Sequence, residues 1–352
     1  MNKKRYVFAA NCNGVGISIL TDELVESILR QKEVNYILVK PKRVEHRFFR
    51  YLVILKEIIY LWWLSVFSPA PLLVVANYFP LPTRSNVVTV LRHPYLLRRN
   101  PERSSHFLEQ SRRLCFWMTC VFSSKIIVQT PFMYDELKCN KLFGRFVHKT
   151  VIVPNPLRNL SHTEIIPILN KKGDRFYQSN KLIIYPSGYY PHKNFEGLVE
   201  AILSESDRYV QAGFKFVFCV DALVDFSRPI GGIEKFGDLS TLFPDLFFIV
   251  GRVSPQELNY LYANSLAGVF PSENETYGNG LYEMEALGIP FLYNATLPFH
   301  PTSSNSYASQ FEKGLLFDQI QQLVSIVKKK KVYPNTSTSQ MDWLNKLFGD
   351  LV

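Results

Sequence analysis

Short apolar runs alternate with amphipathic, helix-like segments along the whole chain. In the first half the runs are Tyr6–Ala10, Tyr36–Val39, Leu72–Ala76, Val87–Leu91, Ile126–Gln129 and Val151–Val153; in the second half they are Leu182–Tyr185, Phe214–Val220, Leu246–Val250, Gly268–Pro271, Pro290–Tyr293 and Gly314–Phe317. The runs are continuously apolar rather than alternating, which is typical of parallel strands covered by helices on both faces. Each half therefore predicts a doubly wound, Rossmann-like α/β domain.

Polar segments mark the expected domain boundaries. Pro154-Asn155-Pro156 ends the last run of the first half, and residues 170–180 are almost free of aliphatic side chains. We therefore expect a first domain over residues 1–155, a linker over 156–180 and a second domain over 181–335. The remaining tail, 336–352, carries Trp343, Leu344, Leu347 and Phe348, which favour packing back on the first domain.

Charge separates the two halves more sharply than hydropathy does. Residues 1–155 hold 23 Lys and Arg against 10 Asp and Glu, and the rest of the 352-residue chain holds 17 against 20. The halves thus carry +13 and −3 of the overall +10. This asymmetry predicts that the first domain meets an anionic partner, which could be nucleic acid, a membrane surface or a phosphorylated substrate. Nucleic acid is disfavoured because no recognised binding module accompanies the charge.

The apolar window over residues 48–75 favours a membrane surface over a membrane crossing. Charged residues and prolines interrupt it before about 20 apolar residues accumulate, so no transmembrane helix is predicted. Arg43, Arg47 and Arg50 recur at helical spacing, and Trp62 and Trp63 follow on an aromatic stretch suited to lipid headgroups. The alternative is an ordinary helix packed on the sheet, with its arginines in water.

The pattern of the five cysteines indicates the redox environment in which the protein is expected to work. They are irregularly spaced, odd in number and without a Cys-x-x-Cys pair, which favours reduced thiols and a cytoplasmic protein.

A glycine loop follows the first predicted strand. Gly14 and Gly16 would let backbone amides approach a phosphate or sugar at the start of the next helix, although a tight turn without a ligand explains them equally. The segment does not fit a nicotinamide fingerprint, because Ile19 stands in place of the third glycine and the second strand ends without an acidic residue.

The second half contains two loops with candidate chemistry. After the run Gly268–Pro271 come Glu275 and, eight positions on, Glu283, a spacing that can direct one carboxylate from a loop and one from a helix into a single pocket. Glutamates that cap the helix are the alternative. After Leu182–Tyr185, Lys193 could neutralise a diphosphate leaving group, although an isolated lysine at this place is more often a solvated surface residue.

The order of these elements resembles the retaining glycosyltransferases of the GT-B fold, specifically the group 1 family that includes many bacterial surface-polysaccharide enzymes. The resemblance is carried, in chain order, by Val153-Pro154-Asn155, by Ser187-Gly188 through Lys193-Asn194, by Phe248–Gly251 with the helix after it, and by the Glu-x7-Glu signature from Glu275 through Glu283 to Gly288 and Pro290. One departure is Tyr189, which stands where the family has an arginine after the glycine.

The resemblance implies a role for each matching residue. Glu283 would hold the ribose hydroxyls, Lys193 the diphosphate and Glu275 the donor sugar. The implied donor-binding set is Gly14, Gly16, Gly188, Lys193, Asn194, Glu275, Tyr277, Gly278, Asn279 and Glu283, and the implied catalytic set is Glu275, His93 and Lys193. His93, in Arg92-His93-Pro94, could instead be a polar residue at a turn before proline.

The resemblance also implies the reaction: transfer of a hexose from a nucleotide diphosphate-sugar to a glycan acceptor, with retention of configuration. The expected acceptor is linked to polyprenyl diphosphate at the cytoplasmic face of the membrane, in cell-surface polysaccharide or lipopolysaccharide O-antigen synthesis. No Asp-x-Asp or His/Cys/carboxylate cluster has ligand spacing, so no metal is expected. A nucleotide-sugar epimerase of the same fold and a catalytically silent scaffold at the membrane surface are the alternatives.

Overall fold

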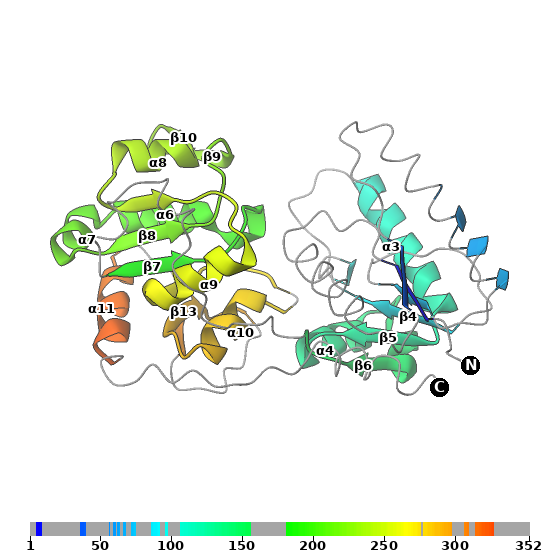
Figure 1. The fold of residues 1–352 in the computed structure, drawn as a ribbon. Helices are drawn as coiled ribbons and strands as arrows, with labels where there is room; N and C mark the ends of the chain where they lie inside the picture. Colours follow the sequence, from blue (N-terminus) through cyan, green and yellow to red (C-terminus); the bar gives the residue numbers. More distant parts are fainter. Residues whose placement is uncertain are drawn as a thin grey trace. The chain divides into compact units, whose positions relative to one another are not determined.

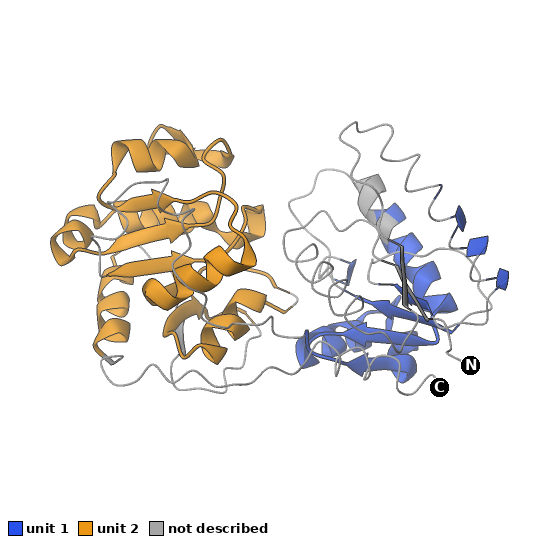
Figure 2. Cartoon of the chain, viewed as in Figure 1, with its two compact units in different colours: residues 1–158, 338–352 blue, residues 159–337 orange. Residues whose placement is uncertain are grey.

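The computed structural model describes residues 5–8, 36–39, 56, 59–60, 62–63, 66–67, 72–74, 86–91, 96–97, 106–155, 181–275, 277–297, 306–309 and 314–326. The chain divides into two compact units (Figure 2): unit 1 comprises residues 1–158 and 338–352, and unit 2 comprises residues 159–337. The expected linker, 156–180, and the expected tail, 336–352, lie outside the described residues.

Unit 1 is built on a six-stranded parallel sheet (Figure 1). Its strands are β1 (Arg5–Phe8), β2 (Tyr36–Val39), β3 (Leu72–Val74), β4 (Val87–Val90), β5 (Lys125–Val128) and β6 (Thr150–Ile152), in the order β2-β1-β3-β4-β5-β6. Helix α3 (His106–Phe122) connects β4 to β5, and α4 (Pro131–Cys139) with the 3₁₀ helix η2 (Gly144–Lys149) connects β5 to β6. Strands β3 and β4 are fully buried, as their continuously apolar sequence predicts.

Unit 2 contains a second six-stranded parallel sheet. Its strands are β7 (Leu182–Tyr185), β8 (Lys215–Phe218), β11 (Phe247–Ile249), β12 (Ser265–Phe270), β13 (Phe291–Asn294) and β14 (Ser306–Ser309), in the order β11-β8-β7-β12-β13-β14. The helices are η4 (Pro191–Lys193), α6 (Phe195–Leu203), α7 (Ser206–Ala212), α8 (Phe236–Leu242), α9 (Pro255–Asn264), α10 (Asn279–Ala286) and α11 (Leu316–Ile326). The prediction of two doubly wound α/β domains is confirmed.

Three elements of unit 2 differ from the sequence prediction. The run Gly314–Phe317 is not a strand: Gly314 takes a left-handed φ of 81°, and α11 begins at Leu316. The reason is periodicity, since Leu316, Ile320 and Leu323 are all buried at helical spacing. The sixth strand is instead the more polar β14, and an unpredicted antiparallel hairpin, β9 (Asp225–Ile230) and β10 (Ile233–Lys235), follows β8.

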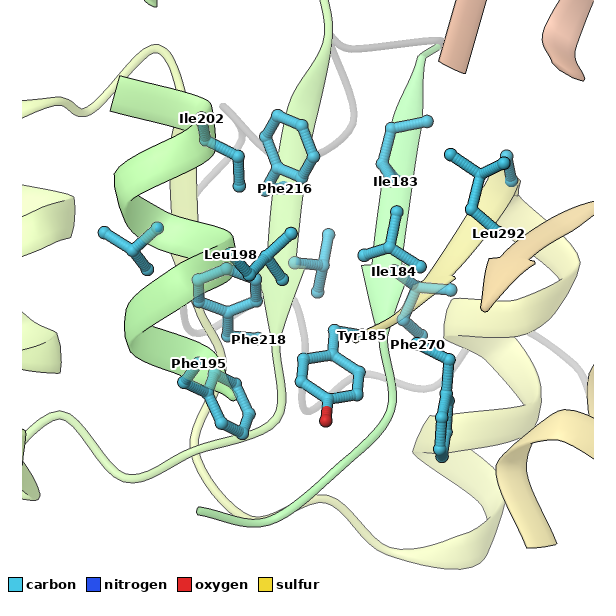
Figure 3. Packing of buried hydrophobic residues seen from close by; sticks show 14 of the residues in the cluster. Ile183, Ile184, Tyr185, Phe195, Leu198, Ile202, Phe216, Phe218, Phe270 and Leu292 are labelled. Atoms are coloured by element: carbon cyan, nitrogen blue, oxygen red, sulfur yellow. The ribbon is translucent and has the colours of Figure 1, made fainter. Parts of the chain in front are cut away.

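The core of unit 2 fixes the start of α6 against the end of β7 (Figure 3). The ring of Phe195, the first residue of α6, lies 4.5 Å from that of Tyr185 and 5.5 Å from that of Phe218. All three side chains are buried. Because aromatic packing of this kind allows little movement, the loop between β7 and α6 is held at both ends.

Of the described helices, none combines the length and apolar character that crossing a bilayer requires.

Candidate functional site

Strand order places the candidate site of unit 2. Numbered along the chain, its sheet reads 3-2-1-4-5-6, and the order reverses between β7 and β12. In open α/β sheets, ligands bind outside the carboxyl ends of the strands at this reversal. The loops that leave β7 and β12 carry Lys193 and Glu275, which were predicted from separate motifs.

Tyr185 holds these two loops together. Its hydroxyl donates to the carbonyl of Lys193 at 2.8 Å, so the 3.0 Å contact with Ser272 is one in which the Ser272 hydroxyl donates. The amide of Glu273 donates to the carbonyl of His192 at 2.9 Å. Burial, opposed by the hydrogen bond from Ser272 and reinforced by the Glu275 carboxylate, raises the pKa of Tyr185 well above its usual value. The phenol therefore remains a neutral donor that fixes the backbone at Lys193.

Lys193 and Glu275 form an ion pair across the reversal point. Their side chains are only 13% and 14% exposed. The ammonium group also lies 5.4 Å from the centroid of the Phe270 ring, at the end of β12. The fold thus brings two residues that are 82 positions apart into one partly buried cluster that offers a ligand both a cation and a hydrogen-bond acceptor.

Glu283 lies in α10, eight residues after Glu275, which belongs to the loop before that helix. Its carboxylate is buried and accepts a 2.8 Å hydrogen bond from the hydroxyl of Tyr262, in α9. A buried carboxylate is stable only when its oxygens have partners, and Tyr262 supplies one of them. The expectation that Glu275 and Glu283 border one pocket stays a prediction.

The amino end of α10 follows the Glu275 loop directly. Gly278 is the residue before the first turn, with a left-handed φ of 76° that other residues adopt only with strain, and no side chain caps the helix there. Asn279 begins the helix, and its first turn therefore presents backbone amides near Glu275. Tyr277 stacks on Tyr282, with ring centroids 4.2 Å apart, and burial raises the Tyr277 pKa, as does the neighbouring Tyr282.

Tyr189, which stands where the resembled family has an arginine, is part of a polar network. Its hydroxyl donates to the carboxylate of Glu196, which also accepts from the amide and hydroxyl of Ser227 at 2.9 and 2.7 Å. Burial alone would raise the Glu196 pKa, but these hydrogen bonds outweigh it and lower the pKa. Tyr189 thus anchors the β9–β10 hairpin to α6 and supplies no positive charge for a ligand.

Gly188 and Asn194 complete the β7 loop. Gly188 accepts a 3.1 Å hydrogen bond from the Ser187 hydroxyl through its carbonyl. Asn194 has a φ of 51°, the one left-handed conformation among the described non-glycine residues. Asparagine tolerates this conformation better than most residues, so its place after Lys193 has a backbone reason as well as a predicted ligand role.

The predicted site residues of unit 1 are not described. Gly14, Gly16 and His93, and the membrane-facing residues Arg43, Arg47 and Arg50, all lie outside the described residues, and their roles stay predictions.

Three supporting residues escaped the sequence analysis: Tyr185, Ser272 and Tyr262. Tyr185 and Ser272 had a usable signal, because a hydroxyl-bearing side chain at the end of an apolar strand, or just after one, lies at the sheet edge where ligands bind. Tyr262 lies in the helix that is part of the family resemblance, but nothing in the sequence indicated its hydrogen bond to Glu283, since a tyrosine on an amphipathic helix is usually part of the core.

Comparison with known proteins gives the fold. No family model and no curated protein matches the chain. Among solved structures, HepE of Anabaena in complex with UDP and glucose is similar with a TM-score of 0.64 and 13% identity, covering 99% of both chains. The lipopolysaccharide outer core galactosyltransferase WaaB has a TM-score of 0.55 and 12% identity, covering 99% of this chain and 100% of its own. UDP-GlcNAc 2-epimerase from Methanocaldococcus jannaschii has a TM-score of 0.55 and 13% identity, covering 100% and 99%. The chain therefore has the GT-B fold, with a Rossmann-like sheet in each of its two units.

Proposed function

We propose that this chain is a retaining glycosyltransferase. It transfers a hexose from a nucleotide diphosphate-sugar to a hydroxyl of a glycan acceptor linked to polyprenyl diphosphate, in the synthesis of cell-surface polysaccharide such as the O-antigen of lipopolysaccharide. The single observation that carries the proposal is the Lys193–Glu275 pair at the strand-order reversal of unit 2. A charged pair at this position suits a ligand that is both anionic and rich in hydroxyl groups.

The proposed donor lies along the loops after β7 and β12. Lys193 meets the diphosphate, and the amides of Tyr277, Gly278 and Asn279 add the positive end of α10. Glu275 binds hydroxyls of the sugar, and Glu283, held by Tyr262, binds those of the ribose. Gly188 and Asn194 shape the loop that carries Lys193.

The proposed chemistry needs neither a covalent nucleophile nor a metal. The bond between the anomeric carbon and the diphosphate oxygen breaks while the acceptor oxygen attacks from the same face. The departing diphosphate accepts the acceptor's proton. Lys193 stabilises the negative charge that develops on the leaving group, which is where a preorganised cation lowers the barrier most.

Unit 1 supplies the remaining proposed contacts. Gly14 and Gly16 approach the donor phosphate or sugar, and His93 lies near the reacting sugar. Arg43, Arg47 and Arg50 face an anionic membrane surface, which makes the protein peripheral on the cytoplasmic face of the membrane. The support for this assignment is the +13 charge of residues 1–155.

The test is a panel of UDP-, GDP- and dTDP-sugars, each incubated with and without a polyprenyl diphosphate-linked glycan. Two results together support the proposal: nucleotide is released only when the acceptor is present, and the new glycosidic linkage has the same anomeric configuration, α or β, as the donor sugar. Inversion of configuration or hydrolysis without acceptor would refute retaining transfer.

An epimerase acting on the same kind of donor is the second candidate. The observation that favours it is the full-length similarity to a UDP-GlcNAc 2-epimerase. The same panel separates the two candidates. An epimerase changes the sugar of its donor in the absence of any acceptor and releases no free nucleotide, whereas the transferase releases nucleotide only when the acceptor is present. The third alternative, a silent scaffold, predicts that no nucleotide-sugar binds.

A further inference from the structure

The ammonium group of Lys193 and the carboxylate of Glu275 neutralise each other at the proposed donor site. Both side chains are partly buried, and the centroid of the Phe270 ring lies 5.4 Å from the ammonium. The ion pairs formed within the described part of the chain give Lys193 no second carboxylate and Glu275 no second cation. A diphosphate that binds Lys193 must therefore displace the Glu275 carboxylate or share the cation with it.

Lys193 is the better anchored partner of the two. Its amide donates to the carbonyl of Tyr190 at 2.9 Å, and its carbonyl accepts from the Tyr185 hydroxyl at 2.8 Å. Tyr185 packs edge-on against Phe270, with ring centroids 5.5 Å apart, and both rings are buried (Figure 3). Glu275 comes from the loop between β12 and α10, and among the described residues Lys193 is the hydrogen-bond partner of its carboxylate. We therefore expect an incoming anion to move the carboxylate rather than the lysine.

A displaced Glu275 carboxylate needs a new hydrogen-bond donor. Its side chain is only 14% exposed, and a carboxylate held away from water without a partner is strongly unfavourable. A nucleotide diphosphate-sugar brings phosphate oxygens for Lys193 and sugar hydroxyls that donate to Glu275. A free nucleoside diphosphate brings no such donor, because its ribose hydroxyls are assigned to Glu283, and its negative charge repels the carboxylate beside it.

We propose that Glu275 is a specificity-determining residue, which acts as the internal counter-ion of Lys193 and selects nucleotides that still carry their sugar over free nucleoside diphosphates. The same contact favours product release. Once the sugar has been transferred, its hydroxyls leave the carboxylate, which returns to Lys193 and weakens the binding of the diphosphate. The inference rests on the proposed function for the identity of the ligand. The direction of the effect follows from the ion pair, because removing this one negative charge should strengthen the binding of free diphosphate and weaken that of the nucleotide-sugar.

The test is titration calorimetry of the full chain, without acceptor, with three matched pairs of ligands: UDP and UDP-glucose, GDP and GDP-mannose, and dTDP and dTDP-glucose. We expect the wild type to bind the nucleotide-sugar of its preferred base more tightly than the corresponding diphosphate. Glu275→Gln removes the charge and keeps the shape of the side chain. It should bind the free diphosphate about three- to tenfold more tightly than the wild type, and the nucleotide-sugar about tenfold more weakly.

Three further variants separate the effect of charge from other effects. Glu275→Asp keeps the charge on a shorter side chain, so its gain in diphosphate affinity should be much smaller than that of Glu275→Gln. Glu200→Gln is the matched control, because it removes a carboxylate from an exposed pair with Arg228 in the same unit, and it should bind both ligands as the wild type does. Glu283→Gln removes a carboxylate that accepts from the neutral Tyr262 hydroxyl, and should weaken the binding of both ligands.

Two results would overturn the inference. The first is a Glu275→Gln variant that binds free diphosphate no more tightly than the wild type. That result is expected if the displaced carboxylate accepts instead from the backbone amides at the start of α10, where no side chain caps the helix. The second is a wild type that binds free diphosphate more tightly than the nucleotide-sugar of the same base, a comparison that depends on no variant.

The same measurements distinguish failure of the inference from failure of the proposed function. If Glu275→Gln gains diphosphate affinity but no acceptor supports transfer, the counter-ion role stands and the transferase proposal fails. If transfer depends on acceptor but Glu275→Gln gains no diphosphate affinity, only the inference fails. A wild type and a Glu275→Gln variant that bind none of the six ligands would refute both.

Discussion

Several described cations of unit 2 pair with carboxylates, whereas two of unit 1 have other partners. In unit 2, Lys193 pairs with Glu275, Arg228 with Glu200, and Arg208 with both Glu205 and Asp318, although Lys181 contacts the Ala212 carbonyl and the Phe214 ring. In unit 1, Arg145 and Lys149 contact aromatic rings and backbone carbonyls. Charge that is neutralised within a fold acts only at short range, whereas charge without a counter-ion acts over about 10 Å at moderate salt. If the proposed function holds, unit 2 recognises its donor through short-range contacts of paired charges, and unit 1 attracts its anionic partner through longer-range electrostatic potential.

The largest expected effect comes from removing the cation of unit 2. Lys193→Ala deletes the charge proposed to stabilise the leaving diphosphate and leaves Glu275 partly buried without its ion-pair partner. We expect kcat to fall about 10²- to 10³-fold, because a preorganised charge acts mainly on the transition state. Initial rates over a range of donor concentrations measure it.

Lys193→Arg is the control for charge, and should keep more activity than Lys193→Ala because a cation remains. Binding to anionic lipid vesicles, which the proposed function assigns to unit 1, should be the same in both variants as in the wild type. Wild-type turnover in Lys193→Ala would remove the lysine from the chemistry, and lost vesicle binding would break the separation between the two units.

The second prediction concerns the carboxylate in α10. Glu283→Gln removes the charge proposed to hold the ribose hydroxyls while keeping a similar shape beside Tyr262. Hydrogen bonds to charged groups contribute about 1.5–3 kcal/mol, so nucleotide affinity should fall about 10- to 100-fold. Titration calorimetry with UDP, GDP and dTDP measures the change.

Tyr262→Phe tests whether the carboxylate needs its buried partner. The hydroxyl acts only through Glu283, so the expected loss of affinity is smaller, about three- to fivefold. If Glu283→Gln bound every nucleotide as tightly as the wild type, the ribose assignment would be wrong.

Sequence patterns predicted the strands of this fold well where burial was complete. The run Leu182–Tyr185 matches β7 at both ends, because all four residues are buried and polar residues precede them. The polar edge strand β14 escaped notice, since an edge strand need not be apolar on both faces. Gly314–Phe317 was assigned wrongly because four apolar residues fit a strand or a helix, and only the later Ile320 and Leu323 reveal the helical period.

The candidate site likewise has features that the sequence predicted and features that it did not. Motif spacing indicated Lys193 and Glu275 separately, and the family resemblance assigned both to one donor site. The strand order explains their contact, because β7 and β12 are neighbours in the sheet that lie far apart in sequence. The partners of Tyr189 were not predictable. Glu196 follows Tyr189 by seven residues, across the loop and η4 into the start of α6, and Ser227 comes from a hairpin whose sequence has no regular alternation.

The third prediction concerns the buried carboxylate of Glu196 in unit 2 and the pH dependence of its contribution to the free energy of unfolding. The folded state lowers the Glu196 pKa, since its hydrogen bonds from Tyr189 and Ser227 outweigh burial. The carboxylate therefore stabilises the fold above its ordinary pKa, and this contribution is lost as pH falls through the lowered value. Glu196→Gln should reduce the free energy of unfolding by about 2 kcal/mol at pH 7, and by progressively less below about pH 4.

Urea denaturation at several pH values measures this difference. Glu200→Gln is the matched control on the same helix, because its carboxylate meets the exposed Arg228 in a solvent-screened pair. Its effect at pH 7 should be much smaller. A Glu196→Gln difference that did not shrink in acid would mean that packing, and not ionisation, accounts for the stabilisation.

The smallest effect expected separates a backbone role from a ligand role at Asn194. Its left-handed φ of 51° strains most side chains, so Asn194→Ala should lower the free energy of unfolding by about 1 kcal/mol, while Asn194→Gly should lower it less. If the backbone alone selects asparagine, Asn194→Gly will bind nucleotide-sugar as the wild type does in calorimetry. A glycine variant that is fully stable but binds the donor weakly would instead assign the amide side chain to the ligand, and would extend the recognition surface of unit 2 beyond its charged pair.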